Sequence, residues 1–173
     1  MIPFEKHELI TVSNALDIAE DATGDFFKFS TGQWKKHGYH VKTLSSLRGG
    51  EISGFALAVL SKGMRVLNDF ESKTKGRDFY FICLQDHLIL SALRRDSNLS
   101  LLPLLVYIFT HELVHIVRFC NFFQRFEVED KKRAEEEEIV HATTFEILKD
   151  FSLSRLDYVL DSYESHRMCR IAF

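Results

Sequence analysis

A mostly apolar run between positions 101 and 119 constrains this 173-residue chain more than any other feature. Its polar centre holds two histidines and a carboxylate, His111, Glu112 and His115. Flanking residues this apolar predict a helix buried in the core, because a helix that is hydrophobic all round leaves no face for water. Ionisable groups inside such a helix are costly unless a cation compensates them. The run therefore predicts a buried helix that carries a cation site.

The spacing of these three residues is typical of a zinc hydrolase. Positions four apart lie on one face of a helix, so His111 and His115 can bind a single Zn²⁺ ion. Glu112 leaves the helix at another angle, which suits it to hold a metal-bound water rather than the metal. A second His-Glu pair, His7 and Glu8, lacks the later histidine and lies in a polar stretch. We expect that pair to be surface.

Composition limits the class of protein. The length and the 46% of hydrophobic residues predict one globular domain over 1–173. The net charge of -3 gives no argument for nucleic acid or an anionic membrane as a partner. The three cysteines form no CxxC pair, which favours a reducing cytoplasm over a disulfide framework. We see no secretory signal, and the apolar run before His111 is too short to span a bilayer.

The pattern along the chain predicts an α+β fold, mostly helical, with a small antiparallel or mixed sheet beside the helix of the zinc motif. Aromatic and β-branched residues predict a strand at 78–84, and 86–90 fits either a second strand or a short helix. Residues 26–47 fit loops or short strands, and about 1–75 is assigned to no known architecture. Helices are expected at 13–20, 51–70, 101–119, 128–150 and 154–164.

A catalytic zinc site needs a third protein ligand, and the helix over 128–150 offers several. At 100° per residue its apolar positions point closest to Glu137, and His141 lies one turn along the same face. We therefore favour Glu137 as the third ligand, with His141 or Glu138 as the alternative; His141 also fits a role supporting a ligand. Glu135 and Glu136 are expected to face outward. A solvated acidic face is the competing interpretation of this run.

The chain resembles the zincin metallopeptidases, most closely the gluzincin branch that includes thermolysin. The resemblance rests on His111-Glu112-x-x-His115 and on Glu137-x-x-x-His141, and it covers about 79–151. Thermolysin-like enzymes have an Asp where His141 stands, which is a departure.

The metzincin branch is a poorer match. Its motif continues with a glycine and a third histidine, and this chain has Arg118 and Asn121 at those positions.

The resemblance implies a minimal single-domain zinc metallopeptidase. Glu112 would take a proton from a zinc-activated water and deliver it to the leaving amine. The strand at 79–84 would be the edge strand beside which an extended substrate lies. Tyr158, Tyr163 and His166 are candidate donors to the oxyanion. The expected substrate is a peptide or a flexible protein segment.

Two other functions fit the same residues. A zincin fold that binds metal without cleaving anything would be a regulatory or interaction protein. Glu112-x-x-His115 and Glu138-x-x-His141 also match the Glu-x-x-His pairs of di-iron carboxylate bundles. The short connection between the two pairs, and the lack of obvious carboxylate helices upstream, weigh against di-iron chemistry.

Overall fold

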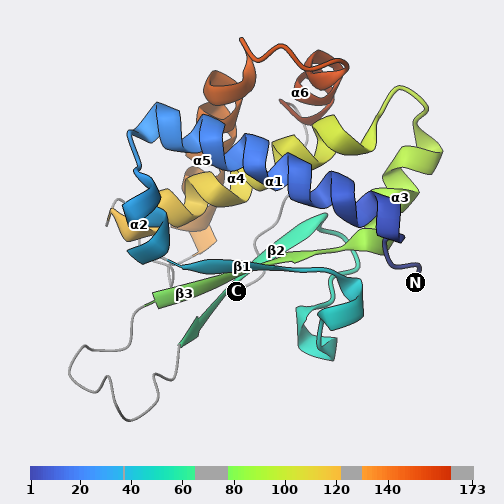
Figure 1. The fold of residues 1–173 in the computed structure, drawn as a ribbon, viewed down its shortest axis with the longest axis horizontal. Coiled ribbons are helices and arrows are strands. Elements are labelled where there is room, and N and C mark those ends of the chain that lie inside the picture. The colour runs from blue at the N-terminus through green and yellow to red at the C-terminus, as the bar shows by residue number, and fades with distance from the viewer. Residues whose placement is uncertain (37, 65–77, 122–129, 165–173) are drawn as a thin grey trace.

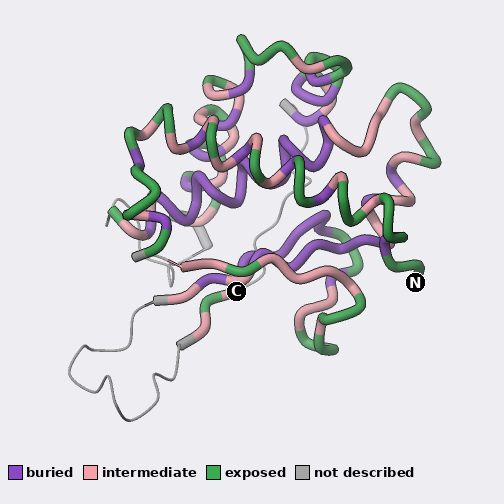
Figure 2. The backbone as a smooth tube through the Cα atoms, viewed as in Figure 1, coloured by how far each residue is buried: buried purple, intermediate pink, exposed green. Residues whose placement is uncertain are grey.

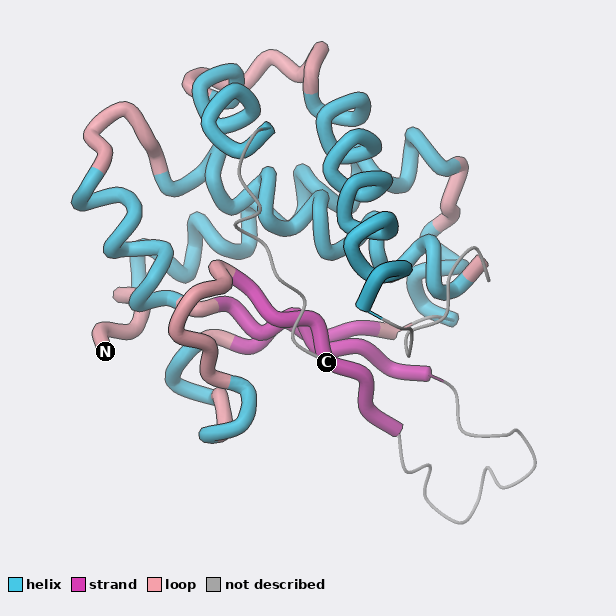
Figure 3. Tube along the Cα trace, turned by 180° about the vertical axis from the view of Figure 1, so that it is seen from behind, coloured by secondary structure: helices cyan, strands magenta, loops and turns pink. Residues whose placement is uncertain are grey.

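A helical layer covers one face of a small sheet in the computed structural model, which describes residues 1–36, 38–64, 78–121 and 130–164. The α+β class is as expected. In Figures 1 and 3 the main helices lie on one side of the strands, and a short irregular segment lies on the other. The order of elements is α1 (Lys6–Phe27), α2 (Thr31–Lys36), β1 (Tyr39–Lys42), two short 3-10 turns at Leu44–Ser46 and Gly49–Glu51, β2 (Ala58–Met64), β3 (Asp78–Leu84), α3 (Asp86–Arg95), α4 (Leu101–Cys120), α5 (Asp130–Leu148) and α6 (Leu156–Glu164).

The sheet is mixed and has the strand order β1-β3-β2. β1 pairs with β3 in parallel, with Tyr39 opposite Tyr80, and β2 pairs with β3 antiparallel, with Ala58 opposite Leu84. The predicted strand at 78–84 is confirmed, but its expected place at an edge is wrong. The strands β1 and β2 pair with its backbone groups, one on each side. The edges of the described sheet are β1 and β2.

Alternate side chains of β3 belong to two different apolar clusters, one on each face of the sheet. Tyr80, Ile82 and Leu84 belong to the main core, which the helices complete. Cys83 packs on the opposite face with Val59 in a smaller cluster. Successive side chains of a strand point to opposite faces, so β3 is buried on both.

α4 is the central helix of the core. It packs against α1, α5 and α6 and touches β2 (Figure 1). Figure 2 colours most residues of this helix as buried. By length and composition α4 could cross a membrane, but 83% of its most apolar window is buried inside the structure, which is the pattern of a core helix. The predicted bounds of 101–119 are confirmed to within one residue.

The helix predicted over 51–70 is wrong. Its described part contains the strand β2, and 65–70 lies outside the described residues. Ala58, Val59 and Leu60 are buried in succession because both faces of the strand are covered, so the spacing of apolar residues carried no signal for a strand. Pairing with β3 then overrides local helix propensity. Gly63 fits here because a Cβ would lie 2.7 Å from the Phe81 ring.

Other helices differ from expectation mainly in length. α1 is longer than the predicted 13–20; its buried residues Val12, Ala15, Ala19 and Thr23 form one stripe. The interval 26–47 contains the unpredicted helix α2 as well as β1, and 86–90 belongs to the helix α3. The described parts of 128–150 and 154–164 are helical at 130–148 and 156–164. His7 lies on the first turn of α1 with its side chain 75% exposed, as expected for a surface pair.

Candidate metal centre

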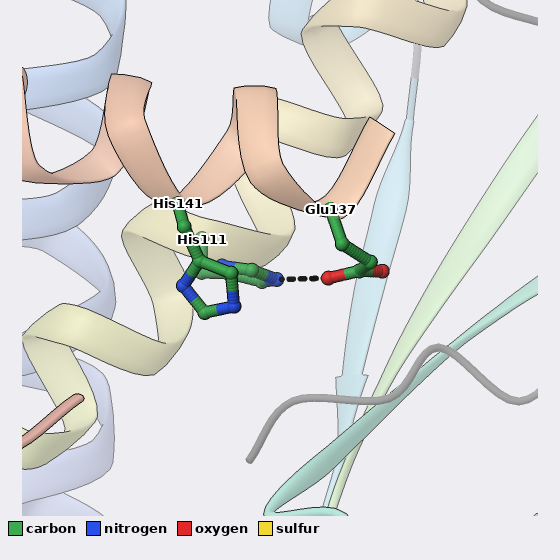
Figure 4. Close-up of side chains that lie close together, drawn as sticks. All are labelled: His111, Glu137 and His141. Carbon is green, nitrogen blue, oxygen red and sulfur yellow. Dashed lines mark ion pairs between the residues drawn. The ribbon is translucent and has the colours of Figure 1, made fainter. Parts of the chain in front are cut away.

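Two helices bring the predicted ligands together. α4 carries His111 and His115 one turn apart, and α5 carries Glu137 and His141 with the same spacing. Since residues four apart share a face, each helix presents its pair to the other. Figure 4 shows Glu137 and His141 reaching from α5 toward His111 on α4.

The donor atoms of three of these residues lie at similar separations. His111 Nε2 is 3.2 Å from His115 Nε2 and 3.4 Å from Glu137 Oε2. His115 Nε2 is 3.5 Å from Glu137 Oε1. Ligands about 2.0–2.1 Å from a tetrahedral Zn²⁺ ion lie roughly 3.3–3.4 Å from one another. The two imidazole nitrogens therefore lie at ligand-like separations from each other and from Glu137, through Oε2 for His111 and through Oε1 for His115.

His141 lies next to this set. The ligand atoms of His111, Glu137 and His141 all lie within 4.8 Å of one another. The Nδ1 atom of His141 is 2.8 Å from the hydroxyl oxygen of Tyr107. His141 is thus close enough to serve as a ligand, or to contact whatever the other three residues bind.

Unsatisfied polar atoms concentrate at this place. Within the described residues, both carboxylate oxygens of Glu137, Oε2 of Glu112 and Nε2 of His141 are buried without a hydrogen-bond partner. The Nδ1 atoms of His111 and His115 are also buried without a hydrogen-bond partner. Buried polar groups are almost always paired in native proteins, so such a cluster calls for an explanation. A bound cation would satisfy the oxygens and the imidazole nitrogen that face it.

Burial and neighbouring groups shift the pKa values of the candidate ligands so that they are deprotonated, as metal binding requires. Burial alone would raise the pKa of Glu137, but the two neighbouring imidazoles outweigh it and hold that pKa well below its usual range. Burial lowers the pKa of His111. It also lowers the pKa of His141 to about 4, assisted by His111. At neutral pH Glu137 is therefore an anion, while His111 and His141 keep a lone pair for a ligand.

Glu112 has the opposite shift. The side chain is 1% exposed. Burial, with a smaller contribution from the charge of Glu137, raises its pKa to about 8. A carboxyl group with a pKa near neutrality is suited to proton transfer.

The four glutamates at 135–138 on α5 differ in burial, and the pattern is not the expected one. Glu135 and Glu138 are exposed, so the alternative ligand Glu138 does not face the cluster. Glu136 was expected to face outward, and this is wrong: it is 5% exposed. Its carboxylate accepts two hydrogen bonds from Arg118, which make its burial tolerable. The exposure of Glu138 also removes one carboxylate that the di-iron interpretation requires.

Tyr107 and Arg118 are the residues that the sequence analysis missed. Tyr107 precedes His111 by four positions and Arg118 follows His115 by three, so both lie on the ligand face of α4. That spacing was the available signal.

The structure describes two of the three predicted oxyanion donors, and one of them, Tyr158, bonds outside the cluster. Tyr158 donates a hydrogen bond of 2.6 Å to Asp96 instead. Tyr163 is buried, with its ring 5.4 Å from that of Tyr107. His166 lies outside the described residues.

Comparison of the chain with protein-family models, with curated proteins and with solved structures found no match.

Proposed function

We propose that this chain is a zinc-dependent metallopeptidase of the zincin type, with His111, His115 and Glu137 as the metal ligands. The observation that carries the proposal is the set of donor separations of 3.2, 3.4 and 3.5 Å among these residues. Two imidazoles and one carboxylate are a donor set used by catalytic zinc, and they leave a fourth position open. A bound zinc ion would supply Lewis acidity toward water and toward a carbonyl oxygen.

Glu112 is the residue to which we assign proton transfer. It follows the ligand His111 directly, and its Oε2 atom is buried without a hydrogen-bond partner in the described residues. The carboxylate accepts the proton of the attacking water, and the resulting acid donates it to the amine nitrogen as the peptide C–N bond breaks. Burial raises the pKa of Glu112 to about 8 in the metal-free protein, and a bound cation would lower it, which would give the carboxylate form that the first step needs.

The substrate in this proposal is a peptide or a flexible protein segment. β3 has neighbours on both sides, so an extended substrate would have to pair with another strand or bind without strand pairing. The proposal includes a cytoplasmic location and neither nucleic acid nor a bilayer as a partner, on the grounds of net charge and cysteine usage.

A catalytically silent metal site is the second candidate. The position of His141 favours it, since this residue lies within ligand distance of the same centre. Four protein ligands close a zinc site, as in structural centres, and leave no position for water.

Metal content and proteolysis together test the proposal. We expect purified protein to carry about one zinc per chain. We also expect it to cleave members of a broad peptide library, and Glu112→Gln to reduce cleavage by about 10²–10⁴-fold while zinc stays bound. Cleavage that survives this substitution would exclude Glu112 as the base. Zinc without cleavage in either protein would favour the silent site, and two irons per chain would support a di-iron centre.

A further inference from the structure

A polar cavity of about 370 Å³ lies between the C-terminal end of α1 and the helix α2, which follows it in Figure 1. Its wall combines the carboxylates of Glu20, Asp21 and Asp25 with the aromatic residues Phe29 and Trp34. No residue of the candidate metal centre lines it. The cavity is therefore a separate candidate binding site with a chemistry of its own.

The carboxylates of this wall lie at the end of α1 where a helix disfavours them. Asp25 belongs to the last turn of the helix, which holds no basic residue. The C-terminal end of a helix carries a partial negative charge, and Asp21 and Asp25, four positions apart, repel each other. Neither aspartate forms an ion pair within the described residues, and Lys28 is the only basic residue on the wall. The negative charge at the cavity is thus left for an outside cation to neutralise.

Trp34 supplies a hydrogen-bond donor to the same cavity. This residue is 7% exposed, and its ring centroid lies 4.6 Å from that of Phe29 and 5.8 Å from that of Tyr39, both edge to face. Its Nε1 atom lies 3.4 Å from the position of a Cβ at Gly24, which is another residue of the wall. No described residue accepts a hydrogen bond from this N–H. A buried indole N–H usually has a partner, so this donor calls for an acceptor on a ligand.

We propose that the cavity binds a peptide segment that carries a lysine or arginine side chain. The cationic group of that side chain pairs with Asp21 and Asp25, and a backbone carbonyl of the peptide accepts the hydrogen bond of Trp34. Packing against Phe29 and Tyr39 fixes the indole in advance, which lowers the entropy lost on binding. The proposal goes beyond the metallopeptidase function and does not rest on it, because the two sites share no residue.

Two simpler cations match the cavity less well. Among the described residues, the only group of His, Cys, Asp and Glu side chains close enough to hold a metal ion is the one at the candidate metal centre. The carboxylates of the cavity therefore do not converge on a single ion. A polyamine such as spermidine has the charge but offers no acceptor to the indole N–H once its amines are protonated. A basic peptide supplies both the cation and the acceptor.

Fluorescence of Trp34 measures binding directly, because this is the only tryptophan of the chain. The probe is the peptide acetyl-Gly-Lys-Ala-Lys-Gly-amide, whose blocked ends leave only the two side-chain charges. Because exposed ion pairs each contribute little, we expect a saturable change with a Kd on the order of 0.1–1 mM. The same peptide with Glu in place of both Lys should cause no change. Equal responses to the two peptides, or none to either, would overturn the proposal.

A pair of double variants tests the carboxylates. We expect Asp21→Asn/Asp25→Asn to weaken binding of the lysine peptide by about fivefold. The matched control is Asp157→Asn/Asp161→Asn on α6, two exposed aspartates with the same spacing and the same change in net charge. At physiological ionic strength distant charges are screened, so the control should stay within about twofold of the wild type. An equal loss in both folded variants would show a general attraction between charges and overturn the proposal.

The indole resonance of Trp34 tests the donor. The chain has one indole N–H signal in ¹H–¹⁵N spectra, and we expect the lysine peptide to move it downfield as the N–H gains an acceptor. Peptide binding that leaves this signal in place would overturn the proposal, as would tighter binding of spermidine or Ca²⁺ than of the peptide. All of these measurements use zinc-free protein, so they judge the cavity whether or not the metal centre takes up zinc.

Discussion

The two helices that form the candidate centre hold their site residues in different ways. On α4, His111, Glu112 and His115 are 0%, 1% and 0% exposed, because α1, α5, α6 and the sheet surround that helix. On α5 the side chain of Glu137 is 18% exposed, and its neighbour Glu138 is exposed. The α4 half of the centre is therefore fixed by the apolar core, whereas the α5 half is the outer wall of the site.

The contacts that dock α5 explain how the outer half is placed. Val140 and Leu148 are fully buried apolar residues of this helix. Besides the contacts of His111 and His115 with the glutamates, α4 makes polar contacts to α5 through Arg118 with Glu136 and through Tyr107 with His141, one on each side of the ligands. The apolar core therefore places His111 and His115, whereas polar contacts at the site itself align the α5 side chains.

The largest expected effect comes from removing a ligand in each half. We expect His111→Gln to abolish zinc binding, because this fully buried imidazole is one of the two ligands that the core holds in place. We expect Glu137→Gln to keep weak zinc binding, because His141 lies beside it as a substitute donor. The loss of affinity should exceed the roughly 100-fold that is typical when a residue supporting a ligand is changed. Calorimetric titration with zinc measures both affinities, and circular dichroism checks that both variants are folded.

The comparison breaks if the two variants behave alike. Complete loss in Glu137→Gln would mean that the outer half is as irreplaceable as the inner one. Binding retained in His111→Gln would remove that histidine from the ligand set.

The next effect concerns the stability of the metal-free protein. Leu105 on α4 is fully buried, and we expect Leu105→Ala to lower the free energy of unfolding by about 2–5 kcal/mol. Ile139 on α5 is 45% exposed, and we expect Ile139→Ala to change it by about 0.5 kcal/mol. Urea denaturation with a chelator present measures both values. Similar losses would show that the outer face of α5 is covered in solution.

The same contrast explains how much of the site was predictable from the sequence. The α4 ligands stand in an apolar run, where three ionisable groups are conspicuous and their burial follows from the surroundings. The α5 ligand stands in a run of four glutamates. Which of them is buried depends on Arg118, a partner on another helix, and apolar periodicity alone placed Glu136 outside.

The sheet shows the same limit. β3 was predicted because its own residues favour a strand, but its central place depends on pairing with β2, the preceding strand, and with β1, which lies further back in the sequence. β2 was predicted as a helix because burial on both faces hides the alternation of a strand. Local composition therefore predicted elements, and contacts between distant segments decided their neighbours.

A third effect is the pH dependence of zinc affinity, to which the α4 half and the α5 half of the centre contribute differently. The pKa of Glu112 is about 8 without metal, so this α4 carboxyl carries a proton at pH 6 that a nearby cation would displace. Zinc affinity should therefore rise between pH 6 and pH 8, by up to about tenfold per pH unit. Glu112→Gln has no such proton, so its affinity should rise less steeply. Glu137 adds no slope here because its lowered pKa keeps it ionised. Chelator competition, corrected for the protonation of the chelator, measures the slopes, and equal slopes would contradict the assignment.

The smallest effect tests the polar contact on the other side of the ligands. Tyr107→Phe removes the hydroxyl that lies 2.8 Å from His141 Nδ1, and we expect it to cost about 1 kcal/mol of stability. Because we assign Glu137 rather than His141 as the third ligand, zinc affinity should stay within about threefold of the wild type. Tyr158→Phe is the matched control, since it removes the hydroxyl that donates to Asp96 at an exposed site. A tenfold loss of zinc affinity confined to Tyr107→Phe would place His141 in the ligand set, and the outer half of the centre would then contribute two donors instead of one.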